Sequence, residues 1–244
     1  MAEKIITSIS NLIEFLRDDI SDYDEDIWFR GQSDFNWKLE PGIFRCSQKM
    51  SESSLLTRFK QSAAMLTNSF PKSDFDWLFL MQHYGVPTRL LDWSESPLTS
   101  LYFAIFENNA TDAALWLLKP IELNKIANIS TVEKNFIPSF EDTELDNYKV
   151  ETLRSNTRNK LAPIATIATR NSTRIQAQLG VFTIHHLDQR SIEEFCTPTE
   201  LVKYRIPAEY KNVIREELSL LGVNKFSLFP ELASIGEILK SKLL

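Results

Sequence analysis

The segment QHYGVPTRLLDWSESPLTSLYFA, residues 82–104, joins two predicted helices through a stiff polar connection. Gly85 and Pro87 end the first helix, because glycine accepts backbone angles that other residues avoid and proline cannot continue a helix. Ser96 and Pro97 then start the second helix, with a capping hydroxyl followed by proline at the first helical position. Between them we expect a loop that is dense in hydrogen-bonding side chains, a feature typical of functional sites.

The remaining elements extend from this segment in both directions and predict an α+β fold. The spacing of apolar residues predicts an N-terminal helix after Ser10 and helices over residues 51–70, 74–84 (capped by Ser73), 207–221 and 232–239. Strands are predicted over residues 27–32, 113–118, 164–168, 181–185 and 201–206. Residues 121–160 are polar and weakly periodic, and we interpret them as a variable insertion with one helix. We expect residues 1–244 to form one domain, a small mixed or antiparallel sheet flanked by helices.

Charge, cysteine content and hydropathy exclude several classes of protein. The formal charge of −6 argues against a broad electrostatic surface for nucleic acid. The two cysteines, Cys46 and Cys196, have no metal-ligand spacing, so we expect neither a metal site nor a disulfide framework. No apolar run approaches the ~18 residues of a membrane span, and the N-terminus lacks the apolar core of a signal peptide. We therefore expect a soluble, cytoplasmic protein that makes no membrane contact.

Three polar segments are candidates for a functional site, and the first is Trp28-Phe29-Arg30-Gly31-Gln32. An arginine that follows an aromatic strand can direct its guanidinium fork at a carboxylate or phosphate. The glycine after it would let a ligand approach the backbone. The alternative is an edge-strand arginine held in a salt bridge.

The second segment is the connection within residues 82–94, where His83 and Tyr84 are followed by further polar residues: Thr88, Arg89, Asp92, Trp93 and Ser94. The helix after it would direct its N-terminus at this region, and a helix N-terminus favours an anionic group. The alternative is structural: Arg89 and Asp92 would form a buried pair, and Ser94 would serve only as a cap.

The third segment, residues 171–182, contains Arg174, Gln176 and Gln178 at alternating positions. On a strand, alternating residues point to the same face, so these three side chains would form one wall of a site. The alternative is a solvated surface. Gly180, which precedes an apolar strand, indicates close packing of the backbone.

Taken together, these segments resemble the FRG domain family, named for the Phe-Arg-Gly found here at Phe29–Gly31. The resemblance extends to QHYGVPTRLLDWS (82–94), SPLTSLYFA (96–104), RIQAQLGVF (174–182) and LFPEL (228–232). It covers nearly the whole chain apart from the polar middle. The family is defined by sequence, so the resemblance by itself implies no particular reaction.

A more distant similarity, to arginine-type ADP-ribosyltransferases, implies an ADP-ribosyltransferase-like fold and NAD as the substrate. Phe29–Gly31 is similar to the Tyr-Arg-Gly strand of those enzymes, residues 92–96 to their Ser-Thr-Ser strand, and Gln176-Ala177-Gln178 to their Glu-x-Glu. The similarity implies four catalytic residues: Arg30, Ser94, Glu95 and Gln178. It implies a larger set that contacts NAD, namely Phe29, Gly31, Gln32, His83, Tyr84, Thr88, Arg89, Asp92, Trp93 and Arg174. No metal is implied.

The glutamine at position 178 departs from the pattern of those enzymes. It keeps a hydrogen bond but lacks the negative charge that stabilises an oxocarbenium-like transition state, so Glu95 or Asp92 would have to supply a carboxylate. Three hypotheses follow. The first is a transferase acting on nucleic acid or protein, as a toxin or effector in bacterial defence with an antitoxin or defence-system partner. The second is a module that binds a nucleotide or polar ligand without reaction. The third is a scaffold in which the polar residues form a buried network, so that Arg30→Ala would unfold the protein.

Overall fold

The computed structural model describes residues 3–47, 50–67, 70–107, 109–129, 133, 135–155, 158, 160–168, 172–241 and 243, and within these residues it shows one mixed seven-stranded sheet. In spatial order the strands are β1 (Lys4–Ile5), β7 (Leu201–Ile206), β4 (Ala113–Leu118), β2 (Trp28–Gln32), β3 (Leu90–Ser94), β6 (Gly180–Ile184) and β5 (Ile164–Thr166). β1 runs parallel to β7, and the other neighbours are antiparallel. The predicted α+β class with a mixed sheet is confirmed.

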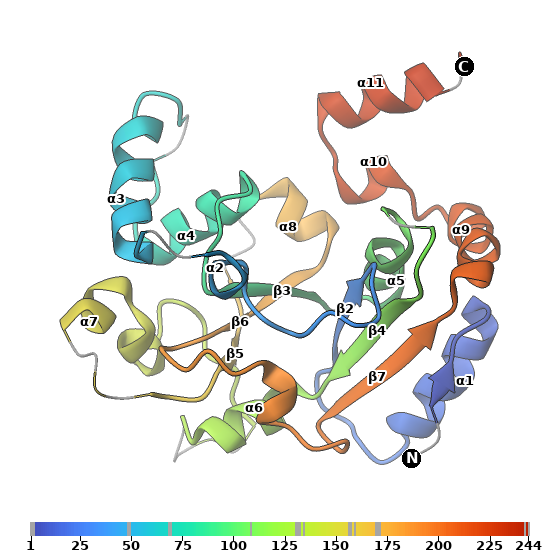
Figure 1. Cartoon of the computed structure of the whole chain (residues 1–244), viewed down its shortest axis with the longest axis horizontal. Helices are drawn as coiled ribbons and strands as arrows, with labels where there is room; N and C mark the ends of the chain where they lie inside the picture. The colour runs from blue at the N-terminus through green and yellow to red at the C-terminus, as the bar shows by residue number, and fades with distance from the viewer. Residues whose placement is uncertain are drawn as a thin grey trace.

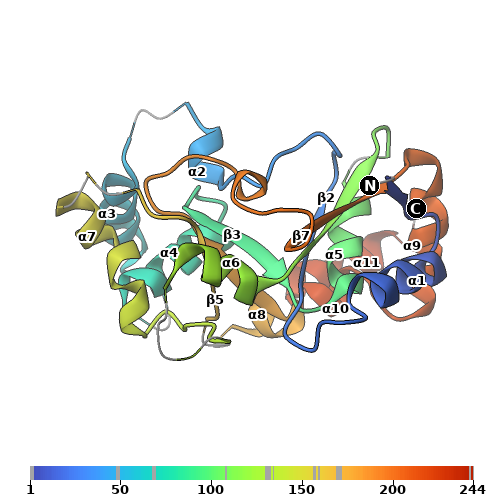
Figure 2. The ribbon, with the colours of Figure 1, turned by 90° about the horizontal axis from the view of Figure 1, so that it is seen from below.

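Helices gather around both ends of this sheet (Figure 1), and the view from below separates the same two groups (Figure 2). At one end lie α1 (Ile9–Asp19), α5 (Pro97–Ile105), α9 (Lys211–Leu220), α10 (Lys225–Leu228) and α11 (Leu232–Ser241). At the other lie α3 (Glu52–Ala63), α4 (Asp74–His83) and α7 (Val150–Ser155). The shorter helices are α2 (Gly42–Arg45), α6 (Pro120–Ala127), α8 (Thr173–Ala177), η1 (Thr143–Tyr148), η2 (Ile192–Glu194) and η3 (Ala208–Tyr210). No helix in the described part of the chain is long and apolar enough to cross a membrane.

Side-chain caps start the helices that border the site, as the sequence predicts. The Ser73 hydroxyl accepts from the Asp76 amide at 3.1 Å, and the Asp76 carboxylate accepts from the Ser73 amide at 2.9 Å, which forms a capping box. The Ser96 hydroxyl caps α5 by accepting from the Thr99 amide at 3.2 Å, with Pro97 in the first turn of the helix. The N-terminal helix begins earlier than predicted, because Ser8 rather than Ser10 accepts from the Asn11 amide.

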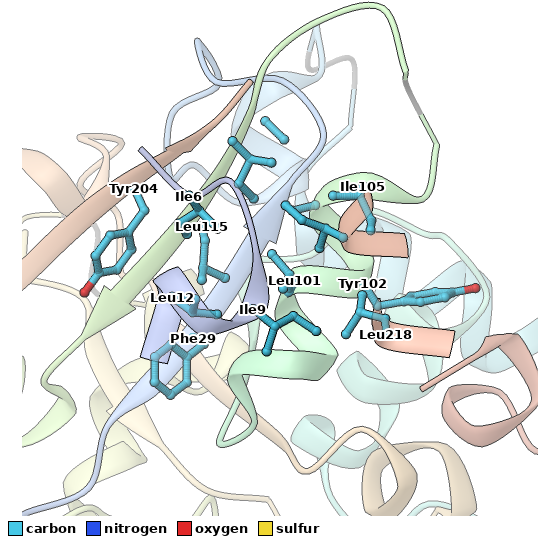
Figure 3. Packing of buried hydrophobic residues seen from close by; sticks show 14 of the residues in the cluster. Ile6, Ile9, Leu12, Phe29, Leu101, Tyr102, Ile105, Leu115, Tyr204 and Leu218 are labelled. Carbon is cyan, nitrogen blue, oxygen red and sulfur yellow. The ribbon is translucent and has the colours of Figure 1, made fainter. Parts of the chain in front are cut away.

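A hydrophobic cluster joins α1, α5 and α9 to one face of β2, β4 and β7 (Figure 3). Phe29 and Leu115 point from the strands toward Ile9, Leu12 and Leu101 on the helices. Burial of side chains of this size stabilises a fold by roughly 1.5–3 kcal/mol each before entropy is subtracted. This cluster therefore fixes α5 against β2, and that contact forms one wall of the site.

A second cluster forms where α3, α4 and α7 pack on β5 and β6, and it includes residues from the predicted insertion. The sequence predicts one helix within residues 121–160, and this is wrong, because α6, η1 and α7 all lie largely or wholly there. Leu145 and Tyr148 belong to this core. Asn124 bonds to both the carbonyl (3.0 Å) and the amide (2.7 Å) of Ala165 on the edge strand β5. Polar composition concealed these contacts because single buried residues, rather than a periodic face, make them.

His185, directly after β6, gives the fold a dependence on pH. Its side chain is fully buried with its ring 5.7 Å from that of Phe44, and burial lowers the pKa of His185 to about 4 from an unperturbed value near 6.5. The folded protein therefore keeps the imidazole neutral, whereas the unfolded chain takes up a proton below pH 6.5. This contribution to stability is fully present above pH 6.5 and is lost as the pH falls toward 4.

We expect the free energy of unfolding to fall by on the order of 3 kcal/mol between pH 6.5 and pH 4 through His185 alone, at about 1.4 kcal/mol per pKa unit. Urea unfolding at a series of pH values measures this change. His185→Leu removes the titrating group, so its stability should vary less steeply over the same range. Equal slopes for the two proteins would contradict the assignment.

Candidate functional site

A cavity of about 910 Å³ opens on the sheet beside β2 and β3, and most of the residues predicted for the site line it. A volume of this size lies within the range that holds small-molecule ligands and cofactors. Its walls come from β2, β3, β6, α4, α5 and α8, together with Arg45 at the end of α2 and Phe229 after α10. Guanidinium groups, carboxylates and aromatic rings all line it.

The cavity lies where two neighbouring strands separate. β2 pairs with β4 along its whole length, from Trp28 to Gln32, but pairs with β3 only at Phe29 and Ser94. Beyond that pair the two strands diverge, and backbone groups on their facing edges lose a ladder partner. Unpaired groups on a strand edge remain available to side chains and ligands.

Arg30 bridges the diverging strands. Its Nη1 donates to the carbonyl of Asp92 on β3, a group on the edge that β2 no longer pairs. The side chain keeps partial solvent exposure and lines the cavity, while its Nε is buried and has no hydrogen-bond partner in the described chain. Burial lowers the pKa of Arg30 to about 10, with the nearby Asp92 opposing and Arg45 assisting the shift. Arg30 therefore remains charged at neutral pH.

A chain of hydrogen bonds holds the carboxylate of Asp92 at the cavity. Gln82 Nε2 donates to Asp92 Oδ1 at 2.8 Å, and the Thr88 hydroxyl donates to Gln82 Oε1. Asp92 is exposed and lines the cavity, whereas Thr88 is buried and does not line it. Thr88 therefore orients Asp92 through Gln82. The prediction that Thr88 contacts the ligand directly is wrong, because Thr88 does not line the cavity.

Residues 90–94 form strand β3, so the predicted loop at this position is wrong, whereas the enzyme resemblance implied a strand. Leu91 and Trp93 are buried on one face in a cluster with Trp28 and Trp116. Asp92 and Ser94 alternate with them and line the cavity. The sequence predicts a loop because Asp92 and Ser94 interrupt the apolar run, although Asp92 is the one exposed residue of the strand.

Ser94 and Gln178 meet at one end of the cavity. The Ser94 hydroxyl donates to the Gln178 carbonyl at 2.7 Å and accepts from the Ser96 amide at 3.0 Å. Gln178 Nε2 donates to the Leu228 carbonyl at 3.1 Å. A carbonyl can only accept, so the amide nitrogen must face Leu228, and the amide oxygen of Gln178 is left as the acceptor. Ser94 thus positions Gln178 through its backbone, and α10 orients the Gln178 side chain.

The segment that contains Arg174, Gln176 and Gln178 is helical, so the predicted strand is wrong. Residues 173–177 form α8, and Gln178 is its C-cap. A strand had no place there, because β6 already pairs with β3 on one edge and β5 on the other. On the helix, Arg174 and Gln178 line the cavity while Gln176 is exposed and does not.

Arg174 and His83 form another part of the wall. The Arg174 guanidinium lies 4.7 Å from the ring centroid of Phe229, in a cation–π contact. The imidazole of His83 stacks edge-on with Tyr84 at 4.9 Å between centroids. Burial lowers the pKa of His83, and the positive charge of Arg174 lowers it further. His83 is therefore neutral at physiological pH and can accept a proton or a hydrogen bond.

Phe29, Gln32 and Trp93 line the cavity as predicted but are largely engaged with the protein. Gln32 donates to the Lys38 carbonyl at 3.1 Å and accepts from the Trp116 indole at 2.7 Å. The Trp93 indole donates to the Thr183 hydroxyl at 3.0 Å. These bonds hold β2 and β3 to their neighbours, so the polar ends of Gln32 and Trp93 shape the wall more than they offer groups to a ligand.

Gly31 has a different role from the one its sequence context predicts. It lines the cavity, but a Cβ atom at this position would lie 1.8 Å from the carbonyl oxygen of Ser100 on α5. The close approach that requires glycine is therefore made by α5, not by a ligand. Gly180 likewise packs against α8, where its Cβ would lie 3.3 Å from Ile175, and this confirms the predicted close packing.

Arg89 does not line the cavity; it forms a buried structural network. Its side chain is 4% exposed, and Nε donates to Glu52 at 2.5 Å. Nη1 and Nη2 donate to the carbonyls of His185 (2.7 Å) and Tyr148 (2.8 Å). The alternative pairing with Asp92 is also wrong, since the partner carboxylate comes from α3. Glu95, one of the four residues predicted to be catalytic, is also outside the cavity wall.

Several wall residues were not predicted from the sequence. Asp76, Phe79 and Leu80 share one face of α4 with His83, at a spacing of three and four residues. That mixed face is a signal that could have identified them. Trp37 and Arg45 reach the cavity from the chain that follows β2. Nothing in their local sequence indicates a site.

Fold and site together define an α+β protein with a cavity at a split in its sheet, lined by charged, polar and aromatic side chains. Residues 25–113, which include β2, β3, α4 and α5, match the model of the FRG domain. These residues therefore match the FRG domain, as the resemblance seen in the sequence predicts. Comparisons with curated proteins and with solved structures give no match. α8 and β6 complete the cavity from outside the matched region.

Within the described residues, no cluster of three or more His, Cys, Asp or Glu side chains could hold a metal ion. The groups that line the cavity suit an organic ligand with anionic and aromatic parts.

Proposed function

We propose that this protein is an ADP-ribosyltransferase-like enzyme that binds NAD in the cavity and cleaves the bond between nicotinamide and ribose. The observation that carries the proposal is that Arg30, Ser94 and Gln178 line one cavity and that the Asp92 carboxylate lines it with them. These residues are far apart in the sequence and come from β2, β3 and the end of α8. An ADP-ribosyltransferase-like arrangement of the sheet is part of the same proposal.

The cavity residues fit the chemical parts of NAD. Guanidinium groups at Arg30 and Arg174 suit phosphate oxygens, and the aromatic rings of the wall suit flat bases. The amide oxygen of Gln178 suits a ribose hydroxyl, because its nitrogen is already bound to Leu228. Neutral His83 suits the removal of a proton from an acceptor.

Asp92 takes the part that a neutral Gln178 cannot take. When the bond to nicotinamide breaks, its electron pair leaves with the ring nitrogen and positive charge develops on the ribose. A fixed carboxylate near that charge lowers the energy of the transition state. Asp92 is held for this role by Gln82, and that hydrogen bond fixes the side chain before a ligand arrives. The ribose carbon would then be attacked by an acceptor from nucleic acid or protein, and a toxin or effector role belongs to this proposal.

The test is nicotinamide release from labelled NAD by the purified protein, with and without a cell lysate that supplies acceptors. We expect Asp92→Asn to lower the rate by about 100-fold or more, since it removes the charge and keeps the shape. Glu95→Gln is the matched control, because it removes a neighbouring carboxylate that does not line the cavity. Loss of activity in Glu95→Gln but not in Asp92→Asn would contradict the assigned role.

A second candidate is a module that binds the nucleotide without cleaving it, and one observation favours it. The side chain at position 178 is uncharged and its nitrogen is bound to the Leu228 carbonyl, which suits stable binding as well as catalysis. Calorimetry with NAD separates the two candidates. Binding without nicotinamide release, with lysate present and with folded protein, would identify the binding module.

A further inference from the structure

Arg45 lies at the end of α2 and faces the same cavity as Arg30. The short helix is held in place by the segment that carries the site. The Ile43 amide donates to the Thr88 carbonyl at 3.3 Å, and Gly42 lies against Pro87. The Arg45 guanidinium turns back along the helix, since its Nη2 would be 3.9 Å from a Cβ atom on Gly42. These contacts fix the backbone of α2 beside the cavity, although the Arg45 side chain itself is exposed.

Arg30 and Arg45 are two like charges that line one cavity, and the Asp92 carboxylate only partly offsets the cost of burying Arg30. Neither forms an ion pair with any residue in the described ranges of the chain. The two groups are close enough that the charge of Arg45 contributes to the lowered pKa of Arg30. Arg30 also keeps a buried Nε without a hydrogen-bond partner among those residues. Like charges and an unsatisfied buried donor both cost free energy, and a bound anion would remove both costs.

We propose that Arg30 and Arg45 together form a subsite for the diphosphate group of a ligand. Two guanidinium forks on different elements match several oxygens spread over two phosphates, whereas a single carboxylate needs only one fork. The indole of Trp37, which is 47% exposed, lines the same cavity and offers a face for a base attached to the diphosphate. The subsite rests on the proposed function only for the identity of the nucleotide that carries the diphosphate. Inorganic pyrophosphate has the same phosphate oxygens and can probe the subsite by itself.

An acidic residue near Arg45 in the sequence also lines the cavity, and its charge is partly paired within the protein. Glu40 lines the cavity between β2 and α2, and its carboxylate lies 3.9 Å from Lys38 Nζ. That pairing partly offsets its charge. Asp92, the carboxylate assigned to catalysis, faces Arg30 through its backbone carbonyl and is bound by Gln82 through its side chain. Neither carboxylate neutralises Arg45.

Calorimetric titration of the whole chain with ADP-ribose and, separately, with inorganic pyrophosphate tests the subsite. Arg45→Ala is compared with Arg58→Ala, which removes the same charge from an exposed position on α3 outside the cavity. We expect Arg45→Ala to weaken both ligands at least about tenfold and to reduce the dependence of affinity on salt. Arg45→Lys should recover part of the affinity, because it restores the charge without the fork. Arg58→Ala should bind like wild type.

The melting temperature without ligand separates binding from folding. Arg45 makes no hydrogen bond or ion pair within the described residues, so Arg45→Ala should melt within a degree or two of the wild type. Equal affinity of Arg45→Ala and wild type for both probes would overturn the proposal. Failure of wild type to bind either probe would overturn it as well. Arg45-dependent binding without nicotinamide release would refute NAD cleavage and leave the subsite in place.

Discussion

The Gly31→Ala variant is expected to lose at least about 4 kcal/mol of folding stability, or to fail to fold. The added methyl group would lie 1.8 Å from the Ser100 oxygen and 2.6 Å from the Ala104 nitrogen. Both atoms belong to the backbone of α5, so no side-chain rotation can relieve the overlap. Overpacking of a core commonly costs 1–3 kcal/mol and costs more where nothing can yield. Here α5 would have to move away from β2, and the buried cluster between them would open.

Urea unfolding followed by circular dichroism measures the loss. Gly236→Ala is the matched control, because it makes the same chemical change inside α11, where the new methyl group meets no atom within 4 Å. That control should be stabilised by up to roughly 1 kcal/mol, since alanine favours a helix over glycine. A Gly31→Ala protein with wild-type stability would show that α5 does not require the close approach.

The Arg30→Gln variant is expected to lose activity or ligand affinity by about 100-fold or more while keeping its fold. Removal of one preorganised donor that faces developing or ligand charge typically costs 10²–10³ in rate, on the order of 3–4 kcal/mol. The structural cost is small, because within the described chain Arg30 makes one hydrogen bond, to the Asp92 carbonyl. Such a bond contributes about 1 kcal/mol. Relief of burial and of repulsion from Arg45 offsets that loss, so we expect unchanged or higher stability.

Nicotinamide release and calorimetry with ADP-ribose measure the functional effect, and urea unfolding measures the structural one. Arg30→Lys should lie between the wild type and Arg30→Gln, because lysine keeps the charge but cannot form a fork. Arg58→Gln removes an exposed arginine outside the cavity and should match wild type in all three measurements. Unfolding of Arg30→Gln would instead support the scaffold hypothesis, in which the polar residues hold the sheet together.

Much of the fold could be predicted from local signals. The caps at Ser73 and Ser96 and the strands over residues 113–118 and 201–206 depend on neighbours within a few positions. Such signals act before any tertiary contact forms. The errors occurred where tertiary contacts override them: residues 173–177 alternate like a strand but had no free sheet edge to join. Asn124 and Tyr148, which lie in a polar stretch, are held by side-chain hydrogen bonds to the backbone of Ala165 and Ala162.

The candidate site was predicted in part. The segments that carry Arg30, Asp92, Ser94 and Gln178 combine arginine, carboxylate and amide groups with glycine, and that composition indicated a polar site. Arg89 is surrounded in the sequence by the same kinds of residue, yet its side chain belongs to the structural network with Glu52. Sequence could not separate the two arginines, because Arg89 has the carboxylate of the distant Glu52 within reach, whereas Arg30 has no ion-pair partner among the described residues.

The sequence by itself determined the α+β class, the approximate positions of the longer helices and of β2, β4, β5, β6 and β7, and the resemblance to the FRG domain. These follow from periodicity, caps and motifs that lie within short stretches of chain. Only the tertiary structure decided where the sheet splits. β2 pairs fully with β4 but meets β3 at the single pair Phe29–Ser94, and α5 packs directly on Gly31. These are contacts between residues up to about a hundred positions apart, so no local pattern encodes them, and they place Arg30, Arg45 and Asp92 around one cavity.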